Sequence, residues 1–262
     1  MERQPKDAPR RPATGRNIAG ILFDKDGTLF DFHATWSAWS REMIVELSAK
    51  DAGRAEAIAA ALGFELASGR FLPGSPIIAE TGAQIAARML PYLPEWDRAS
   101  LERRMDEAAR AAPQAEAVPL VPLLQALAAR GLALGVATND AEAAARAQLE
   151  RAGALGLLDF VAGYDSGHGG KPEPGQLLAF ASAMALDPGS VAMIGDSLHD
   201  LKAARVAGMI AVGVLSGPAR RDELAAAADV ILPDIGALPA WLDGGAVPEP
   251  GQATGARGTG SG

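Results

Sequence analysis

The chain has 262 residues, of which 48% are hydrophobic and 21% are charged, so it can bury a substantial core in one large domain or in a core with a smaller domain. Its formal net charge of -8 argues against a nucleic-acid backbone or an anionic membrane as the main partner, and an anionic substrate would need locally placed positive charge. Cysteine is absent, which excludes disulfides and thiolate chemistry. No apolar stretch approaches the length of a membrane span and no signal peptide is recognisable, so we expect a cytoplasmic protein.

The first strand is preceded by a polar arm. Residues 1–17 are rich in Pro, Arg and Lys without apolar periodicity, which predicts a disordered arm. The stretch that follows, IAGILFDKDGTLF, starts with an apolar run that stops at Asp24, and Asp26 comes next with a glycine and a threonine. Because Asp and Gly end the run within a few residues, we interpret it as a short buried strand followed by a loop. Open parallel sheets bind ligands at the carboxyl ends of their strands.

The next part of the chain is helical in pattern and almost free of strand signals. Apolar residues such as Trp36, Trp39 and Met43 recur at helical spacing. The predicted helices lie at 34–47, 54–62, 78–90 and 100–111, and the loop-like stretch 64–76 contains Arg70. A simple crossover between parallel strands needs little more than a dozen residues, whereas about 100 separate Asp24 from the next strand. We therefore interpret 33–118 as a helical cap inserted into the core.

From Pro119 onward, helices alternate with strands. Strands are predicted at 132–138, 159–164, 191–196, 210–214 and 230–232, and helices at 121–130, 141–152, 174–186, 198–207 and 221–227. This alternation implies right-handed crossovers and a parallel sheet covered on both faces. The predicted fold class is α/β, a doubly wound parallel sheet with a Rossmann-like core and an inserted helical cap. The core comprises 18–32 and 119–243, and the Gly- and Pro-rich end, 244–262, is a predicted disordered tail.

Three of the predicted strands end in polar residues. These are Asp24 and Asp26 after the first strand, Thr138 and Asn139 after the second, and Asp196 and Asp200 after the strand at 191–196. Carboxyl ends of parallel strands lie side by side at one edge of the sheet, so we expect these side chains to converge. Lys171 lies between the strands predicted at 159–164 and 191–196, and the proline after it favours an extended conformation at the lysine.

These acids predict a metal. Together the four aspartates carry about four negative charges, which no phosphate would approach unaided. One Mg²⁺ and Lys171 would supply three positive charges, and the site would be near neutral if one acid holds a proton. Magnesium suits oxygen ligands from one or two carboxylates plus a substrate phosphate. Clustered like charges also raise the pKa of one member, which a general acid requires.

Four motifs along the core resemble a known family. FDKDGTL, VATND, the lysine of GGKPEP and GDSLHD, in that order, resemble the four signature motifs of the haloacid dehalogenase superfamily. The resemblance is to its phosphatases with a helical cap inserted after the first motif. By this resemblance, Asp26 speaks against cleavage of a carbon–halogen bond, because dehalogenases of the superfamily do not keep an aspartate two residues after the nucleophile. The opening motif and the cap position look most like the phosphoglycolate phosphatase branch.

The resemblance implies a catalytic role for each matched residue. Asp24 would be the nucleophile and form an aspartyl-phosphate, which splits one hard displacement into two easier ones. Asp26 would protonate the leaving alcohol and then activate water. Thr138 and the backbone beside Asn139 would hold the transferring phosphoryl group. Lys171 would neutralise the charge that Asp24 shares with the phosphoryl oxygens.

The resemblance also implies a Mg²⁺ site. The ion would be bound by the side chains of Asp24 and Asp196 and the backbone carbonyl of Asp26, with Asp200 as a direct or more distant support. In the predicted cap, Arg70 could bind a substrate carboxylate bidentately, the alternative being an ordinary surface arginine.

The leading hypothesis is a Mg²⁺-dependent phosphatase that acts on a small phosphomonoester, with 2-phosphoglycolate as the candidate substrate. One alternative is a phosphomutase, which would pass the phosphoryl group to a second hydroxyl of a sugar. A second alternative is a non-catalytic phosphate-binding protein of the same fold, against which the intact acids and lysine argue. The expected partner is a small phosphorylated metabolite, with no nucleic acid and no membrane, and the chain is expected to be a monomer or homodimer.

Overall fold

The computed structural model describes residues 18–72, 74–78 and 80–245. The predicted disordered arm, 1–17, lies outside the described residues, as does the predicted tail except for its first two residues. Among the described helices, none combines the length and the apolar character needed to cross a membrane.

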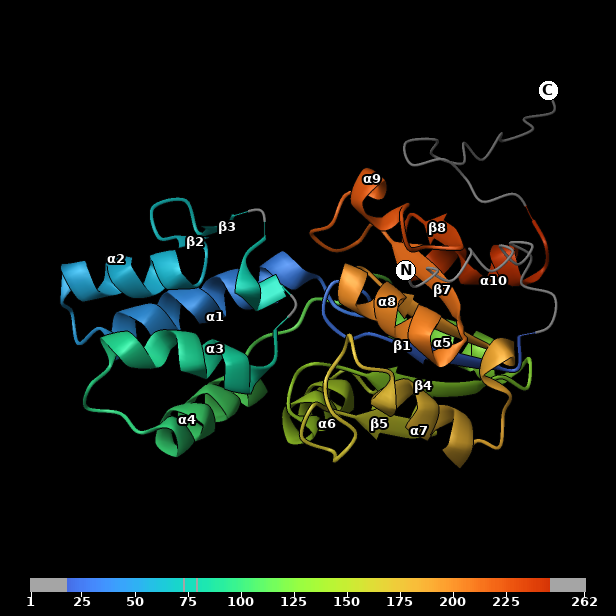
Figure 1. The fold of residues 1–262 in the computed structure, drawn as a ribbon. Helices are drawn as coiled ribbons and strands as arrows, with labels where there is room; N and C mark the ends of the chain where they lie inside the picture. Colours follow the sequence, from blue (N-terminus) through green and yellow to red (C-terminus); the bar gives the residue numbers. More distant parts are fainter. Residues whose placement is uncertain (1–17, 73, 79, 246–262) are drawn as a thin grey trace, which may run out of the picture.

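A parallel sheet forms the core (Figure 1), and its order is β5-β4-β1-β6-β7-β8. The strands are β1 (Gly20–Phe23), β4 (Ala133–Ala137), β5 (Phe160–Ala162), β6 (Val191–Gly195), β7 (Ile210–Val214) and β8 (Val230–Leu232). The first strand lies in the middle, so that Phe23 pairs with Val136 on one side and with Ile194 on the other. The carboxyl end of β1 is therefore flanked by the ends of β4 and β6.

Helices cover both faces of this sheet, as the alternation of strands and helices predicts. They are α5 (Leu120–Ala128), α6 (Glu142–Arg151), α7 (Gly175–Ala183), α8 (Leu198–Ala207), α9 (Arg221–Leu224) and α10 (Leu238–Leu242). Ile21 and Phe23 of β1 pack in the cluster that includes α5, α6 and α10, whereas Leu22 packs with α7 and α8. All of β1 is buried because successive side chains point to opposite, covered faces.

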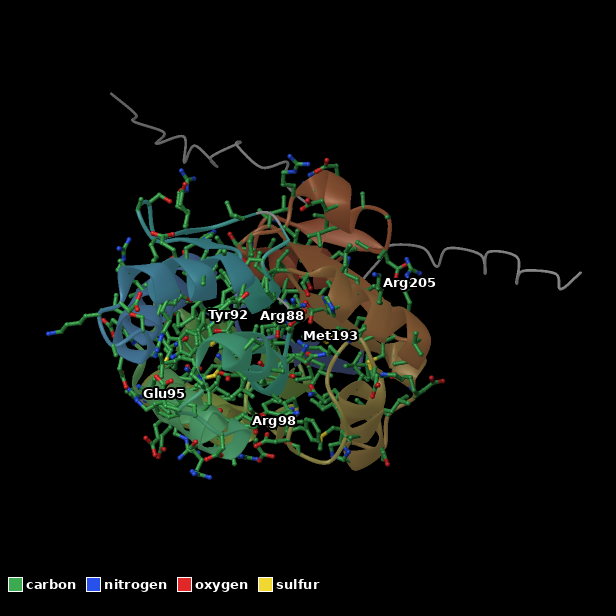
Figure 2. The ribbon with its side chains drawn as sticks, turned by 60° about the vertical axis from the view of Figure 1, so that its left-hand side comes forward. Arg88, Tyr92, Glu95, Arg98, Met193 and Arg205 are labelled. Carbon is green, nitrogen blue, oxygen red and sulfur yellow. The ribbon has the colours of Figure 1, made fainter. Side chains whose placement is uncertain are left out.

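The interior and the surface are clearly separated in the core. Met193 of β6 is fully buried, whereas Arg205 of α8 is exposed at the outer surface (Figure 2). Short 3₁₀ helices complete the chain: η1 (Pro76–Ile78), η2 (Leu90–Tyr92), η3 (Leu155–Leu157), η4 (Pro188–Ser190) and η5 (Ile235–Ala237). The predicted α/β fold class is confirmed.

The segment between β1 and β4 folds as helices with a hydrophobic cluster of their own. Its helices are α1 (Phe32–Leu47), α2 (Ala52–Ala61), α3 (Gly82–Met89) and α4 (Arg98–Ala111), and they lie together beside the sheet in Figure 1. Trp36 and Trp39 of α1 pack in this cluster with Leu101 of α4. Ala141 and Ala144 of the core join the same cluster, so the two parts of the chain are in contact there. The boundaries 33 and 118 stay a proposal.

The loop predicted at 64–76 contains a small antiparallel hairpin, β2 (Phe64–Glu65) and β3 (Arg70–Phe71). Its strands are only two residues long, too short to give a periodic signal in the sequence. The rings of Phe64 and Phe71 pack at 5.0 Å across the hairpin. The helix predicted from residue 78 begins at Gly82 instead, because Thr81 forms a capping box with Gln84.

Candidate active site

The polar residues that follow β1, β4 and β6 meet at the carboxyl edge of the sheet. Asp24, Thr138 and Asp196 each follow one of these strands directly and are only 8%, 2% and 3% exposed. The amide of Asp24 donates to the carbonyl of Ile194 at 2.8 Å, which continues the pairing of β1 with β6 one residue past the strand. The sheet thereby fixes the nucleophile candidate between its two neighbours.

Lys171 reaches this edge from the loop after β5. Its ammonium contacts one oxygen of Asp24 and one of Asp200, each at 2.6 Å, and donates to the carbonyl of Ala137 at 2.7 Å. The side chain of Asn139 forms two hydrogen bonds with the backbone of Lys171. Its Oδ1 accepts from the Lys171 amide and its Nδ2 donates to the Lys171 carbonyl, both at 2.8 Å. Asn139 therefore helps to position Lys171, a role that the sequence did not reveal.

Three carboxylates lie close enough to share a cation. One oxygen from each of Asp24, Asp196 and Asp200 falls within 4.8 Å of the others, and all three residues are buried. Burial raises the pKa of Asp24 to about 7, an effect that Lys171 opposes and that the charges of Asp200 and Asp26 reinforce. Burial, followed by the charges of Asp24 and Asp200, also holds the pKa of Asp196 well above its usual value.

This donor set fits Mg²⁺, which prefers oxygen ligands and relies on few protein carboxylates. The pKa values of Asp24 and Asp196 are raised because their carboxylates are buried and lie close to other negative charges. A divalent cation would offset this repulsion. Asp200 is already engaged on both oxygens. While Oδ1 contacts Lys171, Oδ2 accepts from the amide and hydroxyl of Ser197 at 3.1 and 2.6 Å, closing the amino-terminal end of α8.

Gly27 allows Asp196 to approach the first loop. Its φ of +82° lies in the left-handed region, and a Cβ there would come within 2.4 Å of Oδ2 of Asp196. Only glycine meets both conditions without displacing the carboxylate. The hydroxyl of Ser216 donates to the Gly27 carbonyl at 2.7 Å and fixes the turn from the other side.

The second acid of the first motif is paired with its neighbour. Lys25 is fully buried, donates to Oδ2 of Asp26 at 2.5 Å and lies 3.4 Å from Oδ2 of Asp140. Its ammonium also lies 5.5 Å from the ring centre of Trp36, within range of a cation–π contact. Burial alone would lower the pKa of Lys25, but the carboxylates of Asp26 and Asp140 more than offset it, so the pKa is raised.

Lys25 and Asp140 are site residues that the sequence analysis missed. Both lie inside motifs quoted for other residues, Asp140 as the last letter of VATND. The sequence shows that Asp140 follows a strand end. Its pairing with Lys25, however, depends on β1 and β4 lying side by side in the sheet.

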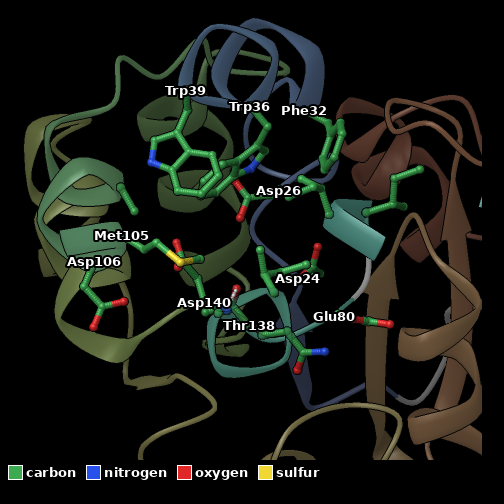
Figure 3. A pocket seen from close by; sticks show the side chains of 16 residues that line it. Asp24, Asp26, Phe32, Trp36, Trp39, Glu80, Met105, Asp106, Thr138 and Asp140 are labelled. Atoms are coloured by element: carbon green, nitrogen blue, oxygen red, sulfur yellow. Dashed lines mark hydrogen bonds between the residues drawn. The ribbon is translucent and has the colours of Figure 1, made fainter. Parts of the chain in front are cut away.

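A cavity of about 90 Å³ lies over Asp24 (Figure 3). Its core side is formed by Asp24, Asp26, Thr138, Asn139 and Asp140. The helical segment closes the other side mainly with apolar groups, and Phe32, Trp36 and Trp39 project from α1 above the acids. The two tryptophan rings meet edge to face at 5.2 Å. They belong to the hydrophobic cluster of the helical segment and also line this pocket.

The structure does not bring Arg70 to this pocket. The exposed Arg70 lines a neighbouring cavity of about 750 Å³, together with His33, Ser197 and His199, and the two cavities share Ile78 and Glu80 in their walls. The other predicted site residues do come together around Asp24: Asp26, Thr138, Asn139, Lys171, Asp196 and Asp200.

The sequence matches the family model described as haloacid dehalogenase-like hydrolase over residues 18–208. A probable phosphatase IndB of Dickeya dadantii is 38% identical over 125 residues, which cover 47% of this chain and 54% of that protein. A phosphoglycolate phosphatase of Rhodospirillum rubrum is 36% identical over 129 residues, 49% of this chain and 52% of the relative. The chain thus spans about half the length of these two relatives. A phosphoglycolate phosphatase of Nitrosospira multiformis is 31% identical over 197 residues, 73% of this chain and 80% of the relative.

Solved structures share the fold. CbbY from Rhodobacter sphaeroides, in complex with phosphate, superposes with a TM-score of 0.65 at 25% identity and covers 86% of this chain and 99% of its own. A predicted phosphoglycolate phosphatase from Haemophilus somnus 129PT gives the same TM-score at 20% identity, with 85% and 97% covered. The resemblance predicted from the motifs is confirmed, including its similarity to phosphoglycolate phosphatases. The chain belongs to the haloacid dehalogenase-like hydrolases.

Proposed function

We propose that this protein is a Mg²⁺-dependent phosphatase that hydrolyses a small phosphomonoester through an aspartyl-phosphate on Asp24. The observation that carries the proposal is the buried contact between Lys171 and Asp24 at 2.6 Å, beside carboxylates of Asp196 and Asp200 and below a cavity. The names of the relatives, probable phosphatase and phosphoglycolate phosphatase, support the same chemistry. A cytoplasmic location, a small phosphorylated metabolite as substrate and a monomer or homodimer belong to the proposal.

The carboxylates of Asp24 and Asp196 and the backbone carbonyl of Asp26 would hold Mg²⁺. When bound, the ion would offset their charge and act as a Lewis acid toward the phosphoryl oxygens. Asp200 would support the site indirectly, because its two oxygens hold Lys171 and Ser197.

Two displacements at phosphorus complete the reaction. In the first, a carboxylate oxygen of Asp24 bonds to phosphorus while the ester P–O bond breaks, and Asp26 gives a proton to the departing alcohol oxygen. In the second, Asp26 takes a proton from water as the water oxygen bonds to phosphorus, and the bond to Asp24 breaks to release inorganic phosphate. Oδ2 of Asp26 is held by Lys25, whereas its buried Oδ1 has no hydrogen-bond partner among the described residues and is available to carry this proton.

The remaining polar groups would bind the phosphoryl oxygens. The ammonium of Lys171 lies against the attacking carboxylate, where it would offset the charge that develops during transfer. Thr138, which lines the pocket beside Asp24, would donate its hydroxyl to a phosphoryl oxygen. Gln176 fixes the strand end below, because its amide donates to the carbonyls of Thr138 and Gly169 at 3.0 and 2.9 Å.

Phosphate release from a panel of small esters, with Mg²⁺ and with a chelator, tests the proposal. We expect Mg²⁺-dependent turnover that Asp24→Asn abolishes and that Asp222→Asn, a change at the exposed surface, preserves. Mass spectrometry of acid-quenched enzyme should detect a phosphate adduct on the peptide that contains Asp24. Folded protein that releases no phosphate from any ester in the presence of Mg²⁺ would contradict the proposal.

The same panel separates the alternatives. With a hexose phosphate, a phosphatase releases free sugar and phosphate, whereas a phosphomutase produces an isomeric sugar phosphate. A non-catalytic protein would bind the ester without changing it. 2-Phosphoglycolate belongs in the panel because relatives carry the name phosphoglycolate phosphatase.

A further inference from the structure

Two buried lysines contact the acids of the first motif, Lys171 beside Asp24 and Lys25 beside Asp26. The side chain of Lys25 is fully buried, and the described residues that line the cavity include Asp26 and Asp140 but not Lys25. Lys25 therefore cannot touch a substrate in this cavity. It can influence the reaction only through the two carboxylates that it contacts.

Both the backbone and the side chain of Lys25 are fixed. Its carbonyl accepts from the amides of Leu29 and Phe30 at 2.9 and 3.0 Å, which closes the turn after β1. Its ammonium donates to Oδ2 of Asp26 at 2.5 Å and lies 3.4 Å from Oδ2 of Asp140. A buried ammonium is costly unless carboxylates compensate it, and the side chains of these two acids are only 15% and 13% exposed. The lysine thus ties Asp26 to the turn that carries it.

Asp140 and Trp36 complete the surroundings of the ammonium. Oδ1 of Asp140 accepts from the Ala141 amide at 3.1 Å, which leaves its Oδ2 for Lys25. The ring of Trp36, which belongs to α1 of the helical segment, has its centre 5.5 Å from the ammonium. Because Asp140 is a second partner, Lys25 keeps a counter-charge even when Asp26 takes up a proton. The contact between Lys25 and Asp26 is therefore compatible with both forms of that acid.

The ammonium of Lys25 decides which oxygen of Asp26 can carry a proton. An ammonium only donates hydrogen bonds, so Oδ2, the oxygen that it contacts, must act as an acceptor. A proton on Asp26 is then confined to Oδ1, which is buried and has no hydrogen-bond partner among the described residues. Without the ammonium, the carboxyl group could turn about its Cβ–Cγ bond, and either oxygen could hold the proton.

We propose that Lys25 is a positioning residue that, together with Asp140, holds Oδ2 of Asp26 and thereby keeps Oδ1 as the oxygen that exchanges the proton. The inference rests on the proposed phosphatase function and adds two residues to its machinery. In the first displacement the proton passes from Oδ1 to the departing alcohol oxygen, and in the second a proton of the attacking water passes to Oδ1. Lys25 keeps its hydrogen bond to Oδ2 in both steps and gives up no proton.

The identity of the leaving group reveals this role. Isopropyl phosphate and 2-phosphoglycolate release an alcohol, whose oxygen needs a proton, whereas acetyl phosphate releases acetate, which is stable as an anion. The ratio kcat/KM covers the steps up to departure of the leaving group and leaves out hydrolysis of the aspartyl-phosphate. With the full chain and Mg²⁺, Lys25→Met should lower kcat/KM for the two alkyl esters by about tenfold to a hundredfold, and for acetyl phosphate by less than about threefold.

Hydrolysis of the aspartyl-phosphate gives a second readout. In Lys25→Met, acetyl phosphate still forms the adduct on Asp24, but the proton of the attacking water is no longer taken up efficiently. We expect kcat and KM for acetyl phosphate to fall together, and mass spectrometry of acid-quenched enzyme to detect more adduct than in the wild type. Calorimetry should show little change in Mg²⁺ affinity, because Lys25 contacts no carboxylate assigned to the metal.

Further variants separate positioning from folding. Lys25→Met leaves Asp140 without its counter-charge, so the double variant with Asp140→Asn removes both charges. It should show the same dependence on the leaving group, even if the single variant does not fold. Asp26→Asn sets the limit, because it removes the acid itself and should affect the alkyl esters most. Lys202→Met, at an exposed position on α8, is the control and should leave all three esters unchanged.

Each outcome separates the inference from the proposed function. An equal loss for all three esters, or no loss for the alkyl esters, would overturn the inference while the phosphatase proposal stands. The same holds if the wild-type enzyme hydrolyses acetyl phosphate alone, because Asp26 would then protonate no leaving group. If no ester shows turnover that depends on Asp24, the phosphatase proposal fails and the inference fails with it.

Discussion

Replacing Lys171 by methionine would keep most of the side-chain volume and remove the ammonium group that joins Asp24 to Asp200. Three acceptors would lose their donor: one oxygen of each aspartate, both at 2.6 Å, and the Ala137 carbonyl at 2.7 Å. The lysine side chain is only 3% exposed, so water cannot readily replace it. Removing one partner of a buried ion pair costs about 3–5 kcal/mol, and we expect that loss in the free energy of unfolding near pH 8.

The loss should depend on pH. The pKa of Asp24 is raised to about 7 even though Lys171 lowers it. In the Lys171→Met variant, the pKa of Asp24 should therefore be higher still. A carboxyl whose pKa is higher in the folded than in the unfolded state stabilises the protein at low pH, and this contribution is lost as pH rises through the folded pKa. At pH 5, Asp24 of the variant is protonated and needs no counter-charge. We therefore expect a smaller loss in the free energy of unfolding at pH 5 than at pH 8, while the lost contacts to Asp200 and the Ala137 carbonyl remain at both pH values.

Urea denaturation of the metal-free proteins, followed by circular dichroism at both pH values, measures these differences. Asp200→Asn should recover about 1–2 kcal/mol when added to Lys171→Met, because the two residues are in contact. Lys202→Met, an exposed change on α8, serves as the control. An equal loss at pH 5 and pH 8, or additive effects of the two substitutions, would refute the account of Lys171 as a counter-charge.

Other predictions concern the metal, the first loop and the position of the lysine. Gly27→Ala should destabilise the protein by about 1–2 kcal/mol or more in urea denaturation, because φ is +82° at this residue. The new Cβ would also displace Asp196, so calorimetry should show weaker Mg²⁺ binding, and an unchanged Mg²⁺ affinity would contradict this expectation. Without metal, the stability that the raised pKa of Asp24 contributes should decrease as the pH rises from about 4 to 7, so Mg²⁺ should raise Tm more at pH 8 than at pH 5. A larger Mg²⁺-induced rise in Tm at pH 5 would contradict this pH dependence. Asn139→Ala should lower kcat by about tenfold with little change in KM, because it loosens Lys171 and removes no group assigned to bind the alcohol; a change confined to KM would count against that role.

Local signals in the sequence determined the fold class and most of the site. Buried strands such as 191–195 are short apolar runs that end in polar residues, and this pattern is visible without a structure. Parallel pairing then forces the ends of neighbouring strands to one edge, so Asp24, Thr138 and Asp196 converge for a topological reason. The order of four motifs added the family, which the comparison with known proteins confirms. Elements of only a few residues, such as the hairpin that carries Arg70, left no periodic signal.

Only the tertiary structure decided how the pocket is walled and how its charges are paired. Lys25 joins Asp26 to Asp140 because two strand ends lie side by side, and no spacing along the chain encodes that contact. The apolar face of α1 predicted a buried helix, whereas its packing against α4 and the core decided that Trp36 would also line the pocket over Asp24. Arg70 was a reasonable candidate from its residue type alone, but the hairpin places it in the wall of the neighbouring cavity and not in the pocket over Asp24. Residue type and periodicity determine secondary structure over short segments of the chain. The lining of the pocket, on which substrate selectivity depends, consists of side chains from segments that are distant in the sequence.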